Sequence, residues 1–158
     1  EPEPVETLAQ QGYVLGSRSI SRLVGVKPKL VDVVKRAIAI STQDFTVVEG
    51  VRTIEKQREY VRRGASQTMN SKHITGDAVD LYPFVDGKIS DNWDYFYAIA
   101  DAMRKAAIEL GVTIRWGGSW AVLNDTPLPP QDLVVPYGNR RRAMGRKAFT
   151  DGPHFELM

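Results

Sequence analysis

The chain has 158 residues, of which 42% are hydrophobic and 25% are charged, and it has no cysteine. This length and composition predict one domain whose core stabilises the fold without disulfide bonds, and any metal ion must bind to nitrogen and oxygen ligands. The formal net charge of +2 is too small to indicate a nucleic-acid partner. No apolar run reaches about 18 residues, so the sequence predicts no membrane-spanning helix.

The first residues show no periodic pattern. Pro2, Pro4, Gly12 and Gly16 interrupt residues 1–16, and we expect a flexible N-terminal tail there. The start is acidic and lacks the basic and then apolar pattern of a secretory signal.

Two helices and a strand are predicted next. Apolar residues recur at intervals of three and four over 28–40, and Pro28 suits the first turn of a helix. Both features predict an amphipathic helix over these residues. The β-rich run 45–51 predicts a strand. Thr53 is suited to cap a second helix over 53–63, and the small polar residues of 64–72 predict a loop.

A strand, a hairpin and a long helix are predicted in the middle of the chain. Residues 76–83 alternate in polarity, which is typical of a strand. The Asp86-Gly87 pair favours a two-residue hairpin turn. A long amphipathic helix follows, capped by Asp91 or Asn92 and ended by a glycine.

The last third of the chain contains two predicted strands separated by a long irregular segment. The strands are predicted over 112–116 and 154–157. Residues 117–148 contain four prolines and a basic cluster, and we expect them to be irregular. Helices that alternate with short strands and hairpins predict an α+β fold, in which a small, mainly antiparallel sheet is flanked by helices.

Two histidines and two aspartates give the clearest chemical signal. His73 lies seven residues before Asp80, and His154 lies near the C-terminus. Two imidazoles and one carboxylate are a sufficient ligand set for a catalytic Zn²⁺ ion that keeps one position open for water. Asp151, three residues before His154, is placed to accept and return a proton. From spacing alone, a plainer interpretation stays open, in which the histidines lie on the surface or are hydrogen-bonded in the core.

The motifs around these residues resemble those of a known family, the LAS-type zinc peptidases of the M15 family. The residues that carry the resemblance are Ser71-x-His73-x-x-Gly76-x-Ala78-x-Asp80 and Asp151-x-x-His154-x-Glu156. Residues 44–53, 67–73 and 115–118 are similar to the branch of phage endolysins that are L-alanyl-D-glutamate peptidases. The family also includes D-Ala-D-Ala carboxypeptidases and dipeptidases of the vancomycin-resistance type.

The resemblance implies a hedgehog/D,D-peptidase-like fold and a zinc-dependent peptidoglycan peptidase. Residues 17–158 would form a single peptidase domain that cleaves a stem-peptide bond, with L-Ala-D-Glu as the expected bond. His73, Asp80 and His154 would bind one Zn²⁺ ion, and Asp151 would be the general base.

The resemblance also suggests roles for four polar residues. Arg52 would polarise the scissile carbonyl or hold a substrate carboxylate, since a fixed cation stabilises developing negative charge; the alternative is a surface salt bridge. Ser71 would contact the substrate or serve only in a turn. Gln57 would assist Arg52 at the substrate or lie on a helix surface. Glu156 is interpreted as a member of a structural ion pair rather than as a partner of a metal ligand.

Two features depart from the pattern of the family. Ser119 stands where relatives often have the aspartate of a Trp-Gly-Gly-Asp-Trp run. Residues 121–148 are a predicted long loop insertion near the cleft. This insertion would act as a lid or as a basic arm that binds an anionic polymer. The alternative is a surface loop that the fold tolerates and that has no function.

The resemblance implies a place of action and leaves alternative functions open. The partner would be the peptidoglycan stem peptide, on the periplasmic or extracellular side of the cell, and the enzyme would be a monomer encoded by a phage or prophage. One alternative is a D,D- or L,D-carboxypeptidase on the same scaffold. The other is a non-catalytic wall-binding module, which the basic cluster at 140–147 suggests.

Overall fold

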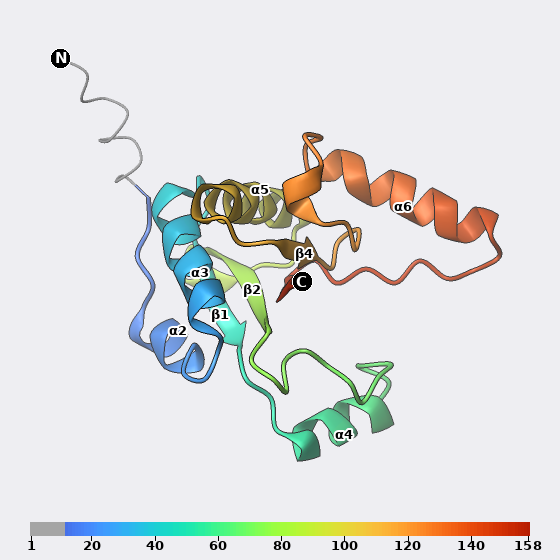
Figure 1. Cartoon of the computed structure of the whole chain (residues 1–158), viewed down its shortest axis with the longest axis horizontal. Helices are drawn as coiled ribbons and strands as arrows, with labels where there is room; N and C mark the ends of the chain where they lie inside the picture. The colour runs from blue at the N-terminus through green and yellow to red at the C-terminus, as the bar shows by residue number, and fades with distance from the viewer. Residues whose placement is uncertain (1–11) are drawn as a thin grey trace.

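The structure is a computed structural model that describes residues 12–158, and a five-stranded sheet lies at its centre (Figure 1). The strands are β1 (Phe45–Glu49), β2 (Ala78–Val85), β3 (Lys88–Ile89), β4 (Ile114–Trp116) and β5 (His154–Leu157). Four of them follow the order β1-β2-β5-β4, β3 pairs with β2, and every pair is antiparallel. The predicted α+β fold with a small antiparallel sheet is therefore confirmed.

The helices include two long ones that cover one face of this sheet. The helices are α2 (Ser17–Arg22), α3 (Pro28–Ile40), α4 (Ile54–Arg62), α5 (Trp93–Leu110), α6 (Gln131–Ala143) and the short 3-10 helix η1 (Leu123–Asp125). The apolar faces of α3 and α5 contribute Leu30, Ile99 and Met103 to a core that also contains Leu81 and Phe155 of the sheet. Within residues 12–158, no helix combines the length and the apolar character that a bilayer span requires.

The side chains of the inner strands alternate between the core and the opposite face of the sheet. Phe155 and Leu157 of β5 are buried in the core. Residues that pair across antiparallel strands point to the same face. Asp80 pairs with His154 and Arg115 pairs with Glu156, so these polar side chains gather on the face that α3 and α5 leave free.

The expected N-terminal tail is only partly covered by the structure. Residues 1–11 lie outside the described residues. Residues 12–16 are anchored to the fold, because the N–H of Tyr13 donates to the carbonyl of Ile38 at 3.0 Å and the side chain of Leu15 is buried in the core.

The expectation that residues 117–148 are irregular is wrong for α6. The helix has Pro130 as its N-cap residue and contains Pro136, which removes a backbone hydrogen bond. Its apolar residues do not gather on one face, so the sequence lacked the periodic signal of a helix. Leu133 and Val134 pack against the core, whereas the rest of α6 projects from the body of the molecule (Figure 1).

Candidate metal centre and catalytic cleft

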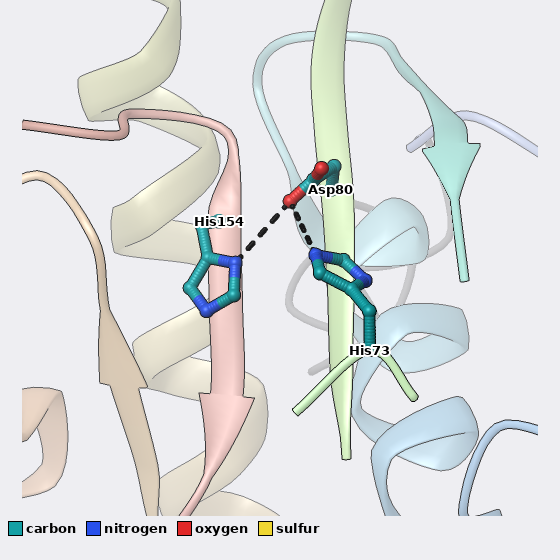
Figure 2. Close-up of side chains that lie close together, drawn as sticks. All are labelled: His73, Asp80 and His154. Atoms are coloured by element: carbon teal, nitrogen blue, oxygen red, sulfur yellow. Dashed lines mark hydrogen bonds and ion pairs between the residues drawn. The ribbon is translucent and has the colours of Figure 1, made fainter. Parts of the chain in front are cut away.

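Three side chains from separate parts of the chain converge on the free face of the sheet (Figure 2). Nε2 of His73 lies 3.1 Å from Oδ1 of Asp80, and Nδ1 of His154 lies 3.4 Å from the same oxygen. All three ligand atoms lie within 4.8 Å of one another. In a tetrahedral zinc centre with bonds of about 2.0–2.1 Å, neighbouring ligand atoms are roughly 3.3 Å apart. The three residues therefore form a group of the size that one metal ion requires.

The hydrogen bonds on the outer side of each imidazole support this assignment. Nδ1 of His73 lies 2.9 Å from the carbonyl oxygen of Gly50, and Nε2 of His154 lies 2.8 Å from Oε1 of Glu156. Each outer nitrogen faces an acceptor and can carry a proton, so the inner nitrogen can offer a lone pair to a metal ion. When an inner nitrogen is protonated instead, it donates to Asp80.

The charges around the centre keep Asp80 ionised. Burial by itself raises the pKa of Asp80, but hydrogen bonds from His154 and His73 outweigh it and hold the pKa below the usual range. Burial opposes the charged form of His154, yet hydrogen bonds to Asp80 and Glu156 raise its pKa to about 9. The acids around His154 thus favour positive charge at this place, whether that charge comes from a proton or from a metal ion.

Asp151 lies beside this centre, in the turn that leads into β5. Its Oδ2 is 4.0 Å from Nδ1 of His154, and its backbone carbonyl accepts the N–H of His154 at 3.0 Å. Burial, followed by the negative charge of Asp80, raises the pKa of Asp151 to about 6. A carboxylate with this position and this raised pKa can exchange a proton with a group in the cleft.

The glycines around the centre are required by close approaches of the backbone. A Cβ atom on Gly117 would lie 2.4 Å from the carbonyl oxygen of Asp151 and 3.0 Å from Cβ of His154. Gly76, in the turn between His73 and Asp80, has a φ of +78°, and a Cβ there would lie 2.5 Å from the carbonyl oxygen of Gly25. Glycine thus allows both ligand-bearing turns to pack tightly.

Arg52 is buried beside the three candidate metal ligands and is held by several partners. Its Nη2 donates to Glu49 at 2.5 Å and lies 3.9 Å from Oδ2 of Asp80, and its Nη1 donates to Gln57 at 2.6 Å. The guanidinium carbon lies 4.4 Å from the ring centre of Tyr60, a cation–π distance. The alternative of a surface salt bridge is wrong, because Arg52 is only 7% exposed.

Gln57 and Ser71, both expected at the substrate, lie in different positions. Gln57 is fully buried, and its amide nitrogen donates to Oγ of Ser66 and to the carbonyl of Thr68. It therefore holds Arg52 and the following loop, and it does not lie on a helix surface. Ser71 lines the cleft, and its Oγ also accepts the N–H of His73 at 3.2 Å.

Glu156 contacts a candidate metal ligand, which the sequence interpretation did not favour. One carboxylate oxygen lies 2.8 Å from the ring nitrogen Nε2 of His154, and the other lies 3.5 Å from Nζ of Lys72 and 3.8 Å from Nη1 of Arg115. It is thus both a partner of a candidate ligand and a member of an ion-pair cluster. Ser119 is buried, and its Oγ accepts the N–H of Ala121, so it shapes the turn before the cleft.

These residues lie in one cleft with a volume of about 750 Å³. Its lining includes most residues of the loop at 65–72, and Trp120 and Phe149 form another part of its wall. The two aromatic rings stack with centroids 6.1 Å apart, and Nε1 of Trp120 donates to the carbonyl of Phe149 at 2.9 Å. Sequence reasoning missed Glu49, Tyr60 and this aromatic pair, because no local pattern links them to the ligands.

Comparisons with known proteins point to one family. The family model for phage L-alanyl-D-glutamate peptidase matches residues 11–132. The L-alanyl-D-glutamate peptidase of Escherichia phage T5 is 38% identical over 117 residues, which are 72% of this chain and 85% of that protein. The peptidase of the same name from Listeria phage A118 is 37% identical over 84 residues, 53% of this chain and 29% of that protein.

A solved structure supports the same family. The crystal structure of the Serratia marcescens L-Ala D-Glu endopeptidase ChiX is 38% identical and superposes with a TM-score of 0.70. The match covers 92% of this chain and 90% of that one. The similarity of fold therefore extends well beyond the residues that the family model matches.

Proposed function

The chain belongs to the phage L-alanyl-D-glutamate peptidase family, and we propose that it hydrolyses the L-Ala-D-Glu bond of the peptidoglycan stem peptide. One observation carries the proposal. His73, Asp80 and His154 present three ligand atoms to one point in a cleft that Asp151 and Arg52 also line. Metal-assisted amide hydrolysis uses three parts: a set of metal ligands, a carboxylate that accepts and returns a proton, and a fixed cation that stabilises negative charge.

The metal ion in this proposal is a single Zn²⁺. Two imidazoles and one carboxylate, with the outer imidazole nitrogens bound to acceptors, are the ligands of a catalytic zinc centre. When bound, the ion would activate a water molecule and polarise the scissile carbonyl.

Asp151 is the general base in this proposal. Its carboxylate is partly exposed to the cleft and lies next to His154, so a water molecule at the centre is within its reach. Asp151 accepts a proton from the attacking water and returns it to the amine of D-Glu as the amide bond breaks. Since the turn that carries Asp151 also carries His154, the base and the ligand keep a fixed relative position.

Arg52 stabilises negative charge on the substrate. The guanidinium is held by Glu49 and Gln57, and it lines the cleft beside Asp80. As the carbonyl oxygen of L-Ala gains negative charge, a cation that is already fixed there lowers the barrier without reorganisation.

One chain supplies the ligands, the base and the cation, so the proposed enzyme acts as a monomer. Its place of action is the bacterial cell wall, where the stem peptide is found. A phage or prophage origin agrees with the two phage relatives.

The test is digestion of purified sacculi followed by mass spectrometry of the products. We expect peptides with a new D-Glu N-terminus to be released and L-Ala to stay on the glycan. Chelation by EDTA should abolish the release, and Zn²⁺ should restore it. Loss of a terminal D-Ala alone would instead assign a carboxypeptidase, and intact sacculi would refute the peptidase proposal.

A further inference from the structure

The positive charge of this protein is concentrated in one short segment, α6 and the residues that follow it. We call residues 131–147 the basic arm; it contains Arg140, Arg141, Arg142, Arg146 and Lys147, and no acidic residue lies between Asp132 and Asp151. The whole chain has 21 basic and 19 acidic side chains, so without these five it has 16 basic ones and a net charge of −3. We propose that the basic arm is a second substrate-binding surface, which holds the anionic peptidoglycan polymer outside the cleft.

The cations of the basic arm are available for a partner. Arg140, Arg142, Arg146 and Lys147 are exposed, and among residues 12–158 no carboxylate lies within ion-pair distance of any of the five. By contrast, Arg36 of α3 pairs with Glu109 of α5, and Arg104 of α5 pairs with Asp101. Unpaired neighbouring cations repel one another, so an anionic partner that binds there relieves this repulsion.

The helix itself does not need this much positive charge. Cations in the last turn of a helix interact favourably with its dipole, and Arg140, Arg141 and Arg142 lie in that turn. This effect falls off beyond the last turn, so it leaves Arg146 and Lys147 unexplained. Folding also gains little from Arg146 and Lys147, because exposed charges without ion-pair partners contribute little to stability.

The basic arm is connected to the wall of the cleft. The hydroxyl of Tyr137 in α6 donates to the carbonyl of Phe149 at 3.1 Å, and the indole of Trp120 donates to the same oxygen. Trp120 and Phe149 both line the cleft. The chain runs from the basic arm back to β5 (Figure 1), so the arm is continuous with the segment that carries Phe149 of the cleft wall.

The chemistry of the substrate fits this surface, and this step rests on the proposed function. D-Glu has two carboxyl groups, and only one of them can continue the stem peptide. A glycan strand with many stem peptides is thus a row of carboxylates, one of which enters the cleft while others face the basic arm. Binding at two places on one polymer raises the overall affinity without new contacts at the reacting bond.

The experiment compares one substrate with many stem peptides and one with a single peptide. The variant R140Q/R142Q/R146Q/K147Q removes four exposed cations and keeps Arg141, whose Nε donates to the carbonyl of Lys147. The control R18Q/K29Q/K35Q/K88Q removes the same charge from four other exposed positions. Both full-length proteins are assayed on sacculi and on a soluble L-Ala-D-Glu peptide, at low and high salt, after circular dichroism has shown that they are folded.

The expected result separates the two substrates. At low salt the arm variant should show an apparent KM for sacculi about tenfold higher than that of the wild type, because exposed charges contribute a few tenths of a kcal/mol each. The kcat/KM for the soluble peptide should not change, the control should behave as the wild type, and the difference should shrink at high salt.

Three results would overturn the proposal. They are an unchanged KM for sacculi, an equal loss on both substrates, and an equal effect of the control variant. Cosedimentation with sacculi on ice measures binding alone, so it tests the basic arm even if the wild type does not cleave the L-Ala-D-Glu bond. If the substitutions weaken binding to anionic phospholipid vesicles but leave binding to sacculi intact, the partner is a lipid surface and the polymer assignment is wrong.

Discussion

The floor of the cleft, by which we mean the part lined by His73, Asp80, His154 and Arg52, differs in construction from the basic arm. On the floor, three residues of the proposed mechanism are held by neighbours: His73 by Gly50, His154 by Glu156, and Arg52 by Glu49 and Gln57. The arm is a projecting helix that contains a proline and carries exposed cations without acidic partners among residues 12–158. Bond cleavage depends on positions fixed to within fractions of an ångström, whereas attraction to a charged polymer acts over about 10 Å and tolerates motion. The comparison suggests that rigidity is concentrated where chemistry occurs.

The largest effect should follow the substitution of a metal ligand on the rigid floor. Asp80→Asn removes the charged oxygen that faces both imidazoles, so we expect the bound metal to be lost and activity to fall by at least about 10³-fold. Metal content of the purified protein and release of peptides from sacculi measure the two effects.

The neighbouring Asp77 provides a matched control for this experiment. It pairs with Lys27 and accepts the hydroxyl of Thr75, away from the three ligand atoms. Asp77→Asn should therefore keep the metal and most of the activity. Equal metal loss in both variants would contradict the assignment of Asp80 as a ligand.

The next largest effect should come from Asp151→Asn, which keeps the shape of the side chain but removes its ability to accept a proton. We expect kcat to fall by about 10²- to 10⁴-fold while the metal content stays unchanged. Single-turnover assays with the soluble peptide measure the chemical step. Asp132→Asn makes the same change of side chain in the first turn of α6, outside the cleft, and serves as the control. Full activity of the Asp151 variant would remove this residue from the mechanism.

A smaller effect should follow Gln57→Ala, because Gln57 acts through Arg52. Its loss removes the shortest hydrogen bonds of a buried guanidinium nitrogen and of the Thr68 carbonyl, which keep only long contacts to Ser71 and Ser66, and this costs about 1–3 kcal/mol of unfolding free energy. We expect kcat/KM to fall by roughly tenfold, since Arg52 is no longer fixed. Urea unfolding and peptide kinetics measure both effects, with the exposed Gln131→Ala as the control. Unchanged kinetics in the destabilised variant would limit Gln57 to a role in folding.

The smallest effect should come from Tyr137→Phe, which removes a hydrogen bond between the basic arm and the wall of the cleft. The bond from Tyr137 to Phe149 joins the arm to the wall of the cleft, and both residues are partly exposed. We expect a loss of about 0.5–1 kcal/mol in unfolding free energy and a change of less than about threefold in kcat/KM for the soluble peptide. A loss as large as that of the Gln57 variant would show that the arm is a rigid part of the catalytic wall.

The sequence predicted the elements whose signals are local. The periodicity of 28–40 corresponds to α3 over Pro28–Ile40, and Asn92 caps α5 with its side chain. Gly111 ends α5 in the left-handed conformation that glycine favours. The sequence missed α6, because two prolines and scattered apolar residues give this helix no periodic face. Its formation depends on anchors outside the helix, such as the packing of Leu133 against the core.

For the site, the sequence by itself determined which residue types were available: two histidines, and aspartates at spacings that resemble a metal peptidase. Only the tertiary structure decided how they are used. The pairing of β2 with β5 brings Asp80 beside His154. The packing of α4 buries Gln57 against Arg52, and within β5 the carboxylate of Glu156 faces the outer nitrogen of His154. Such contacts join residues whose relation depends on strand register and burial, and neither is encoded in a pattern that a short stretch of chain can carry.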